Sequence, residues 1–189
     1  MPSSNPPVRP TRAELEAARN LTVPDVIAPE LRVLFCGINP GLYTAATGHH
    51  FARPGNRFWP ALHRSGFTSS LLPYWEESSL LELGLGITNL VARTTPVASE
   101  LSPDELRAGG QELLAKLELY RPRWLAMLGV TSFRVAFGQP GVGVGPQPEL
   151  LGPSRVWLLP NPSGLNAHYQ LPALAAEFAR LRVAAGTGD

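Results

Sequence analysis

The sequence contains a single cysteine, Cys36, and no long apolar run. One cysteine excludes a disulfide within the chain and a cluster held by four thiolates, and it fits a reducing compartment. There is no secretory apolar segment after the start, and no stretch reaches the length needed to cross a membrane. These absences predict a soluble, cytoplasmic protein that has no contact with membranes, in which Cys36 packs as a small apolar side chain.

Lysine is also scarce, and acidic residues are missing from one long stretch. Lys116 is the only lysine among 16 basic residues, and the net charge is +1, so no overall positive charge points to a polyanionic partner. Between Leu31 and Trp75, however, there is no Asp or Glu, whereas this stretch holds four arginines and three histidines. The local pattern favours an anionic ligand, although chance spacing of surface charges would produce it too.

The 189 residues, 44% hydrophobic and 16% charged, suit one globular domain with a substantial core. Short apolar runs alternate with helical patterns, which is typical of a parallel sheet covered on both faces. We expect strands at residues 32–36, 86–90, 124–128 and 155–159, and helices at residues 11–20, 56–65, 103–120, 131–137 and 171–183. The prediction is a three-layer α/β/α fold with a mostly parallel central sheet of about four strands.

Turn and cap signals divide the rest of the chain. Residues 1–10 hold four prolines and are predicted to be a flexible tail, residues 11–185 the domain, and residues 186–189 a flexible C-terminus. Two capping boxes, beginning at Thr11 and Ser102, predict helix starts. Residues 37–55 are predicted to be a long loop, and residues 138–152, with five glycines and three prolines, a surface excursion.

Two Asn-Pro loops carry the functional signal: GINPG at residues 37–41 and NPSGL at residues 161–165. Each follows a predicted strand, and ligands of open parallel sheets bind beyond the carboxyl ends of the strands. The two loops are therefore predicted to form two walls of one site. Pro40 restricts Asn39 to extended geometry, so that the Asn39 amide can orient a water or bind a substrate, although Asn-Pro often only caps a turn.

Two further residue patterns bear on the chemistry of this site. Leu165 lies in a polar loop, where an apolar tip either wedges between nucleic-acid bases or folds back onto the sheet. His49 and His50 are adjacent, which suits a single metal ion poorly, so no metal site is expected.

The two loops, together with four further motifs in the same order, resemble the mismatch-specific uracil-DNA glycosylases, a family that includes the thymine-DNA glycosylases. The further motifs are GHHF at 48–51, GNRFW at 55–59, GITNLV at 86–91 and RAGG at 107–110, and the resemblance covers residues 31–182. It implies a uracil-DNA glycosylase fold and a monofunctional glycosylase without a cofactor. The implied partner is duplex DNA that contains G:U or related lesions. The protein would act as a monomer and associate with the nucleoid when bound to DNA.

The resemblance also implies roles for individual residues. Asn39 would position the water that attacks the sugar, the backbone around Ile38 would bind the uracil edge, and Phe51 would stack on the extruded base. Asn161 would fix the second loop and the nucleotide. Leu165 would fill the gap in the duplex, while Gly164 and Asn166 would offer main-chain groups to the orphaned guanine.

The chain departs from the family at three positions. Ala92 stands where relatives often have an acidic residue, and Ala167 stands where a relative carries Arg. Thr44 replaces a smaller residue, so we expect it to disfavour the methyl group of thymine. Two other functions stay open: a module that binds mismatches or lesions with little or no cleavage, and a nucleotide hydrolase on the same fold.

Overall fold

A computed structural model describes residues 5–186. Residues 1–4 of the predicted flexible tail and residues 187–189 of the predicted flexible C-terminus lie outside the described part. The central sheet has strand order β2-β1-β3-β5-β4. Its strands are β1 (Val33–Gly37), β2 (Leu85–Asn89), β3 (Trp124–Leu128), β4 (Gly145–Pro146) and β5 (Arg155–Leu159).

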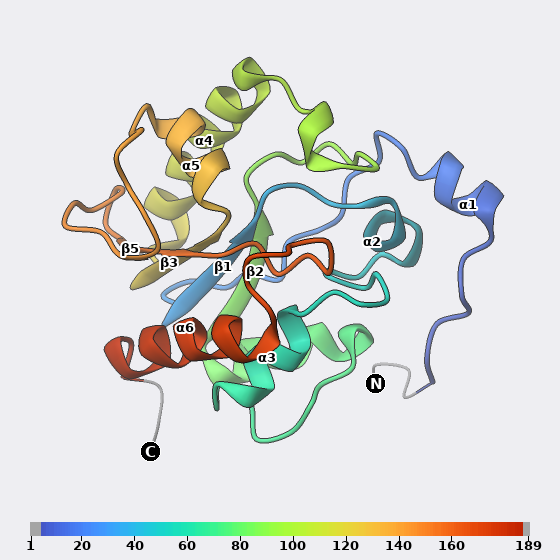
Figure 1. Ribbon diagram of the computed structural model, residues 1–189, viewed down its shortest axis with the longest axis horizontal. Coiled ribbons are helices and arrows are strands. Elements are labelled where there is room, and N and C mark those ends of the chain that lie inside the picture. Colours follow the sequence, from blue (N-terminus) through green and yellow to red (C-terminus); the bar gives the residue numbers. More distant parts are fainter. Residues whose placement is uncertain (1–4, 187–189) are drawn as a thin grey trace.

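Helices cover both faces of this sheet (Figure 1). In that view, α4 (Pro103–Tyr120) and α5 (Val130–Phe137) lie above the sheet, and α3 (Phe58–Arg64) and α6 (Leu171–Ala184) lie below it. The short helix α1 (Arg12–Ala17) and the 3₁₀ helices η1 (Tyr74–Leu83) and η2 (Ala98–Glu100) complete the described elements, together with α2 (Leu42–Thr47). The predicted three-layer, mostly parallel fold is confirmed.

The apolar runs form strands because both sides of each strand are buried. On β1, Val33 and Phe35 pack into the cluster shared with α3 and α6, while Leu34 and Cys36 pack into the cluster shared with α4 and α5. Phe35 contacts Phe58 edge to face, with ring centroids 5.4 Å apart. Two cores on opposite sides thus fix the sheet as the rigid middle layer of the molecule.

Both predicted capping boxes are present. Thr11 accepts a hydrogen bond from the Glu14 main-chain N–H, and Ser102 accepts one from that of Glu105. In return, the main-chain N–H of each cap residue donates a hydrogen bond to the carboxylate of its glutamate, so the first turn of α1 and of α4 is satisfied locally.

Two sequence predictions need correction. The segment predicted as an unbroken loop contains α2, because Gly41 and Gly48 act as the two caps of a six-residue helix and not as loop punctuation. The predicted excursion at residues 138–152 contains β4, a two-residue antiparallel strand that pairs Gly145 with Leu158. The sheet therefore has five strands, four of them the predicted parallel ones.

Within residues 5–186, no helix is long and apolar enough to span a membrane.

Candidate active site

The two Asn-Pro loops meet at one cavity of about 210 Å³, beyond the carboxyl ends of β1 and β5. Strand β3 lies between these two strands, and Leu128 at its end forms part of the cavity wall. The chain turns into α5 directly after Gly129, where a Cβ atom would lie 3.1 Å from the Ile38 side chain. Because the chain turns into α5 at this point, the loops that follow β1 and β5 leave a trough between them, with Leu128 as part of its wall.

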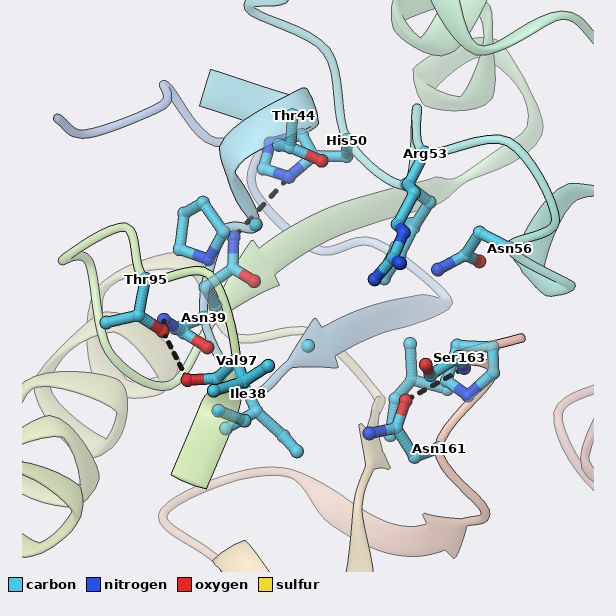
Figure 2. Close-up of a pocket in the computed structure, with 18 of the residues that line it drawn as sticks. Ile38, Asn39, Thr44, His50, Arg53, Asn56, Thr95, Val97, Asn161 and Ser163 are labelled. Atoms are coloured by element: carbon cyan, nitrogen blue, oxygen red, sulfur yellow. Dashed lines mark hydrogen bonds between the residues drawn. The ribbon is translucent and has the colours of Figure 1, made fainter. Parts of the chain in front are cut away.

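Asn39 is held in one orientation on the first wall of the trough. Its Nδ2 donates hydrogen bonds to the main-chain oxygen of Arg93 at 2.9 Å and to Thr95 Oγ1 at 2.7 Å. The Arg93 carbonyl can only accept, so the atom facing it must be the amide nitrogen. Both amide hydrogens are thereby used, and the remaining group, Oδ1, is an acceptor on a residue that lines the cavity (Figure 2).

Phe51 lies on a tightly fixed turn at the edge of the same cavity. Its φ of 54° is left-handed, and its ring stacks on Phe58 with centroids 4.2 Å apart. The turn is anchored from both sides. The His50 N–H donates to Glu77 Oε2 at 2.7 Å, and the Trp59 indole donates to the His50 carbonyl. A strained backbone held by so many contacts at a cavity is typical of a functional position.

The second wall is a loop that is braced from within. Asn161 Oδ1 accepts a hydrogen bond from the Ser163 N–H at 3.0 Å, and Asn166 Nδ2 donates to the Asn161 carbonyl at 3.0 Å. Leu165 at the tip is 72% exposed and lines the cavity mouth. Of the two alternatives for Leu165, the structure has the projecting side chain and not the one folded back onto the sheet.

A comparison with known families matches residues 24–182 to the model of the Uracil DNA glycosylase superfamily. The chain belongs to the uracil DNA glycosylase superfamily. The superfamily acts on DNA, so the trough between the two loops is the candidate site for a nucleotide of DNA.

Among solved structures, the chain is similar to a Methanosarcina acetivorans protein studied by solution NMR and named as a "putative Uracil DNA glycosylase". The sequence identity is 16%, the match covers 86% of this chain and 98% of that chain, and the TM-score is 0.56. At this identity the similarity supports the shared fold.

The cavity brings together all the residues predicted for catalysis and for the substrate. Ile38, Asn39, Thr44, Phe51 and Asn161 all line the cavity, and Thr44 is only 6% exposed there. The predicted DNA-contacting residues are in the second loop. Gly164 and Leu165 line an adjoining groove with residues 53–57, whereas Asn166 lines neither hollow.

Sequence reasoning missed several cavity residues. Thr95, which holds Asn39, comes from the segment after β2, and Asn89 ends that strand with its Nδ2 3.4 Å from His50 Nδ1. Arg53 and Asn56 reach into the cavity opposite Asn161 and Ser163 (Figure 2). The acid-free stretch was the one signal that pointed to Arg53.

The electrostatics of the cavity suit an anion. None of the residues lining it is acidic, and the guanidinium of the exposed Arg53 has no hydrogen-bond or ion-pair partner among residues 5–186. Ala92 is exposed and lies outside the lining, and Ala167 is exposed beyond the loop tip. Burial raises the pKa of the Cys36 thiol, so Cys36 is a packed apolar group and not a nucleophile.

In the described part of the chain, no group of three or more His, Cys, Asp or Glu side chains is placed to hold a metal ion.

Proposed function

We propose that this superfamily member is a monofunctional uracil-DNA glycosylase of the mismatch-specific branch, which includes the thymine-DNA glycosylases. It flips uracil, especially uracil opposite guanine, out of duplex DNA and hydrolyses the N-glycosidic bond to leave an abasic site. The observation that carries this proposal is the pairing of two groups on one cavity: the Asn39 amide oxygen, held for a water, and the exposed Leu165 at the rim.

The reaction requires little from the protein beyond positioning the water and the nucleotide and stabilising the charge that develops on the departing uracil. A water oxygen bonds to C1′ of the deoxyribose, the bond from C1′ to N1 breaks, and uracil leaves with the electron pair. The proton released by the water ends on uracil or in solvent. Asn39 Oδ1 accepts a hydrogen bond from this water and orients it, which an amide can do without acting as a strong base.

The residues around Asn39 would hold the extruded base. The ring of Phe51, fixed by its stacking on Phe58, offers a flat surface to uracil. The main chain around Ile38 would bind the polar edge of the base, and Asn161 would keep the second loop against the nucleotide.

The second loop supplies the contact to the duplex. Leu165 would enter the space that the flipped nucleotide leaves, as apolar wedges do between base steps. The main-chain groups of Gly164 and Asn166 would face the unpaired guanine. Flipping costs a few kcal/mol and least in a mismatched pair, which favours uracil opposite guanine over uracil opposite adenine.

The test is single-turnover base release from a panel of duplexes with G·U, A·U, G·T and ethenocytosine, using the native protein and Asn39→Ala. We expect release from G·U to be fastest and Asn39→Ala to slow it about 100-fold or more. Release that is equally fast in Asn39→Ala would contradict the role of Asn39. No release from any duplex by the native protein would contradict the glycosylase itself.

One observation favours a second candidate, a module that binds mismatches or lesions without cutting. The cavity lining has no carboxylate, and Ala92 removes the acidic residue that relatives often carry. Tight binding to G·U duplex with no base release would support this alternative.

A nucleotide hydrolase is the third candidate, and Leu165 separates it from the first. Leu165→Ala should impair release from duplex DNA and leave a reaction on free nucleotides unchanged. Equal turnover of free deoxyuridine nucleotide and G·U duplex by the native protein would favour the hydrolase.

A further inference from the structure

The guanidinium of Arg57 lies against the second loop and is hydrogen-bonded to residues along most of the loop's length. Nη1 and Nη2 donate hydrogen bonds of 2.8–3.3 Å to five acceptors of the loop: the main-chain oxygens of Ser163, Gly164, Asn166 and Tyr169, and Gln170 Oε1. No carboxylate in residues 5–186 pairs with Arg57. One side chain from the start of α3 therefore organises the loop that carries Leu165.

The main chain joins the same two segments independently. The Arg57 N–H donates to the Pro162 carbonyl at 2.9 Å. Gly164 lies so close to Gly55 that a Cβ atom at position 164 would be 2.6 Å from the Gly55 carbonyl oxygen. The second loop thus rests on the 55–57 segment, and Arg57 lies at the junction.

We propose that Arg57 is a positioning residue that holds the second loop ready for DNA before the duplex arrives. An apolar loop tip in water gains by collapsing onto other apolar surface, yet Leu165 projects into solvent. Arg57 opposes this collapse because the hydrogen bonds from its guanidinium hold the main-chain carbonyls of the loop in place. Its planar fork matches several acceptors at once, which the single ammonium group of a lysine does not.

The proposal rests on the proposed function for its catalytic consequences. Arg57→Gln removes the charge and the fork, and Arg57→Lys keeps the charge but not the fork. Both should slow uracil release from G·U duplex about 100-fold, because a misplaced wedge loses the aligned geometry. Arg64→Gln, an exposed arginine on the same helix, is the matched control and should change the rate by less than about 3-fold.

A double-mutant cycle decides whether Arg57 acts through Leu165. If it does, Arg57→Gln added to Leu165→Ala should cost little more than Leu165→Ala alone. Losses that multiply would show that Arg57 acts elsewhere, and they would overturn the proposal.

Hydrogen–deuterium exchange supplies a readout that does not depend on activity. In Arg57→Gln and Arg57→Lys, amides of residues 161–170 should exchange at least about tenfold faster, while amides of β1 and β3 keep their native rates. Unchanged exchange in the loop, or faster exchange throughout the sheet with a lowered Tm, would overturn the proposal. If the native protein releases no uracil, the proposed function fails, and the exchange result still decides the role of Arg57.

Discussion

The amide nitrogen of Asn39 lies 2.7 Å from the hydroxyl oxygen of Thr95, and that hydroxyl donates its own hydrogen to the Val97 carbonyl at 2.8 Å. Since its hydrogen is committed to Val97, the Thr95 oxygen can only accept from Asn39. This relay selects one of the two flipped states of the Asn39 amide and places Oδ1 as its free acceptor. Thr95 is 1% exposed, so water does not compete for the bond.

Thr95→Val should therefore slow catalysis without weakening DNA binding. Valine has nearly the same shape as threonine but leaves one Asn39 N–H and the Val97 carbonyl without their partner. We expect the single-turnover rate on G·U duplex to fall about tenfold to 100-fold while the Kd for the duplex stays within about twofold. Thr95→Ser, which keeps the hydroxyl, is the control. Equal rates for the serine and valine variants would contradict the relay.

Thr44→Ala should widen the range of accepted bases. Thr44 is buried in the cavity wall, and removing its methyl and hydroxyl groups makes room for the 5-methyl group of thymine. The ratio of thymine to uracil release, from G·T and G·U duplexes, should rise about tenfold, because one methyl group in a pocket is worth 1–3 kcal/mol. Thr47→Ala, on the same helix and outside the cavity lining, should leave the ratio unchanged. A native protein that already releases thymine efficiently would disprove the role of Thr44.

Arg53→Gln should lower DNA affinity in a salt-dependent way. The Arg53 guanidinium lies at the cavity rim without a hydrogen-bond partner in the described part of the chain, where a phosphate of the flipped nucleotide can approach. We expect the slope of log Kd against log salt to decrease by about one. Arg180→Gln, which removes an arginine paired with Glu177, is the control for net charge. An unchanged slope would place the phosphate elsewhere.

Gly109→Ala should destabilise the fold, and Gly110→Ala should not. A Cβ atom at position 109 would lie 2.3 Å from the Leu90 carbonyl oxygen, whereas one at position 110 meets the Ala136 carbonyl at 3.1 Å. Overpacking against the main chain costs about 1–3 kcal/mol. In Gly110→Ala the better helix propensity of alanine, about 1 kcal/mol, offsets the tighter contact. Urea unfolding of both variants measures the difference, and equal losses would contradict it.

The ion pair between Glu105 and Arg93 should make the free energy of unfolding depend on pH in the acid range. The hydrogen bonds from the Arg93 side chain and then from the Ser102 main chain lower the pKa of Glu105 to about 2. A carboxyl whose pKa is lowered on folding stabilises the fold above its unfolded pKa of about 4.3, and this contribution is lost as the pH falls toward 2. The difference in free energy of unfolding between native protein and Glu105→Gln should thus be full at pH 7 and shrink between pH 4 and 2.

Denaturant unfolding across that pH range, with Glu112→Gln as a control for the loss of an exposed carboxylate on the same helix, checks this prediction. A difference that stays constant down to pH 2 would contradict it.

Local signals in the sequence predicted the strands and the long helices. The run at Trp124–Leu128 is buried on both faces, and the capping box at Ser102 fixes the start of α4, so both elements are legible from neighbouring residues alone. Helix α2 and strand β4 were not predicted because both are short and glycine-rich: α2 has a glycine at each cap, and β4 begins with Gly145 in a segment rich in Gly and Pro. The role of Gly41 and Gly48 as helix caps, and the pairing of β4 with β5, depend on the folded chain and are not encoded by neighbouring residues.

The site was predictable to the extent that its residues belong to motifs. Asn39 and Asn161 each lie two residues beyond the end of a strand, so the rule on strand ends brings them together. Thr95 and Arg57 could not be assigned, since their partners lie 56 and more than 100 residues away in the chain. Their roles depend on which carbonyl or amide the fold places opposite them, and no local pattern encodes that.

The position of β3 between the two loops has a consequence for how this trough can change. Neighbouring strands are about 4.8 Å apart, so the ends of β1 and β5, with β3 between them, are separated by about 10 Å. The backbone hydrogen bonds of the sheet set this distance, whatever side chains the loops carry. Substitutions in the loops can therefore alter which base is accepted. The distance between the ends of β1 and β5, and with it the width of the opening, stays constant as long as the strands keep their order.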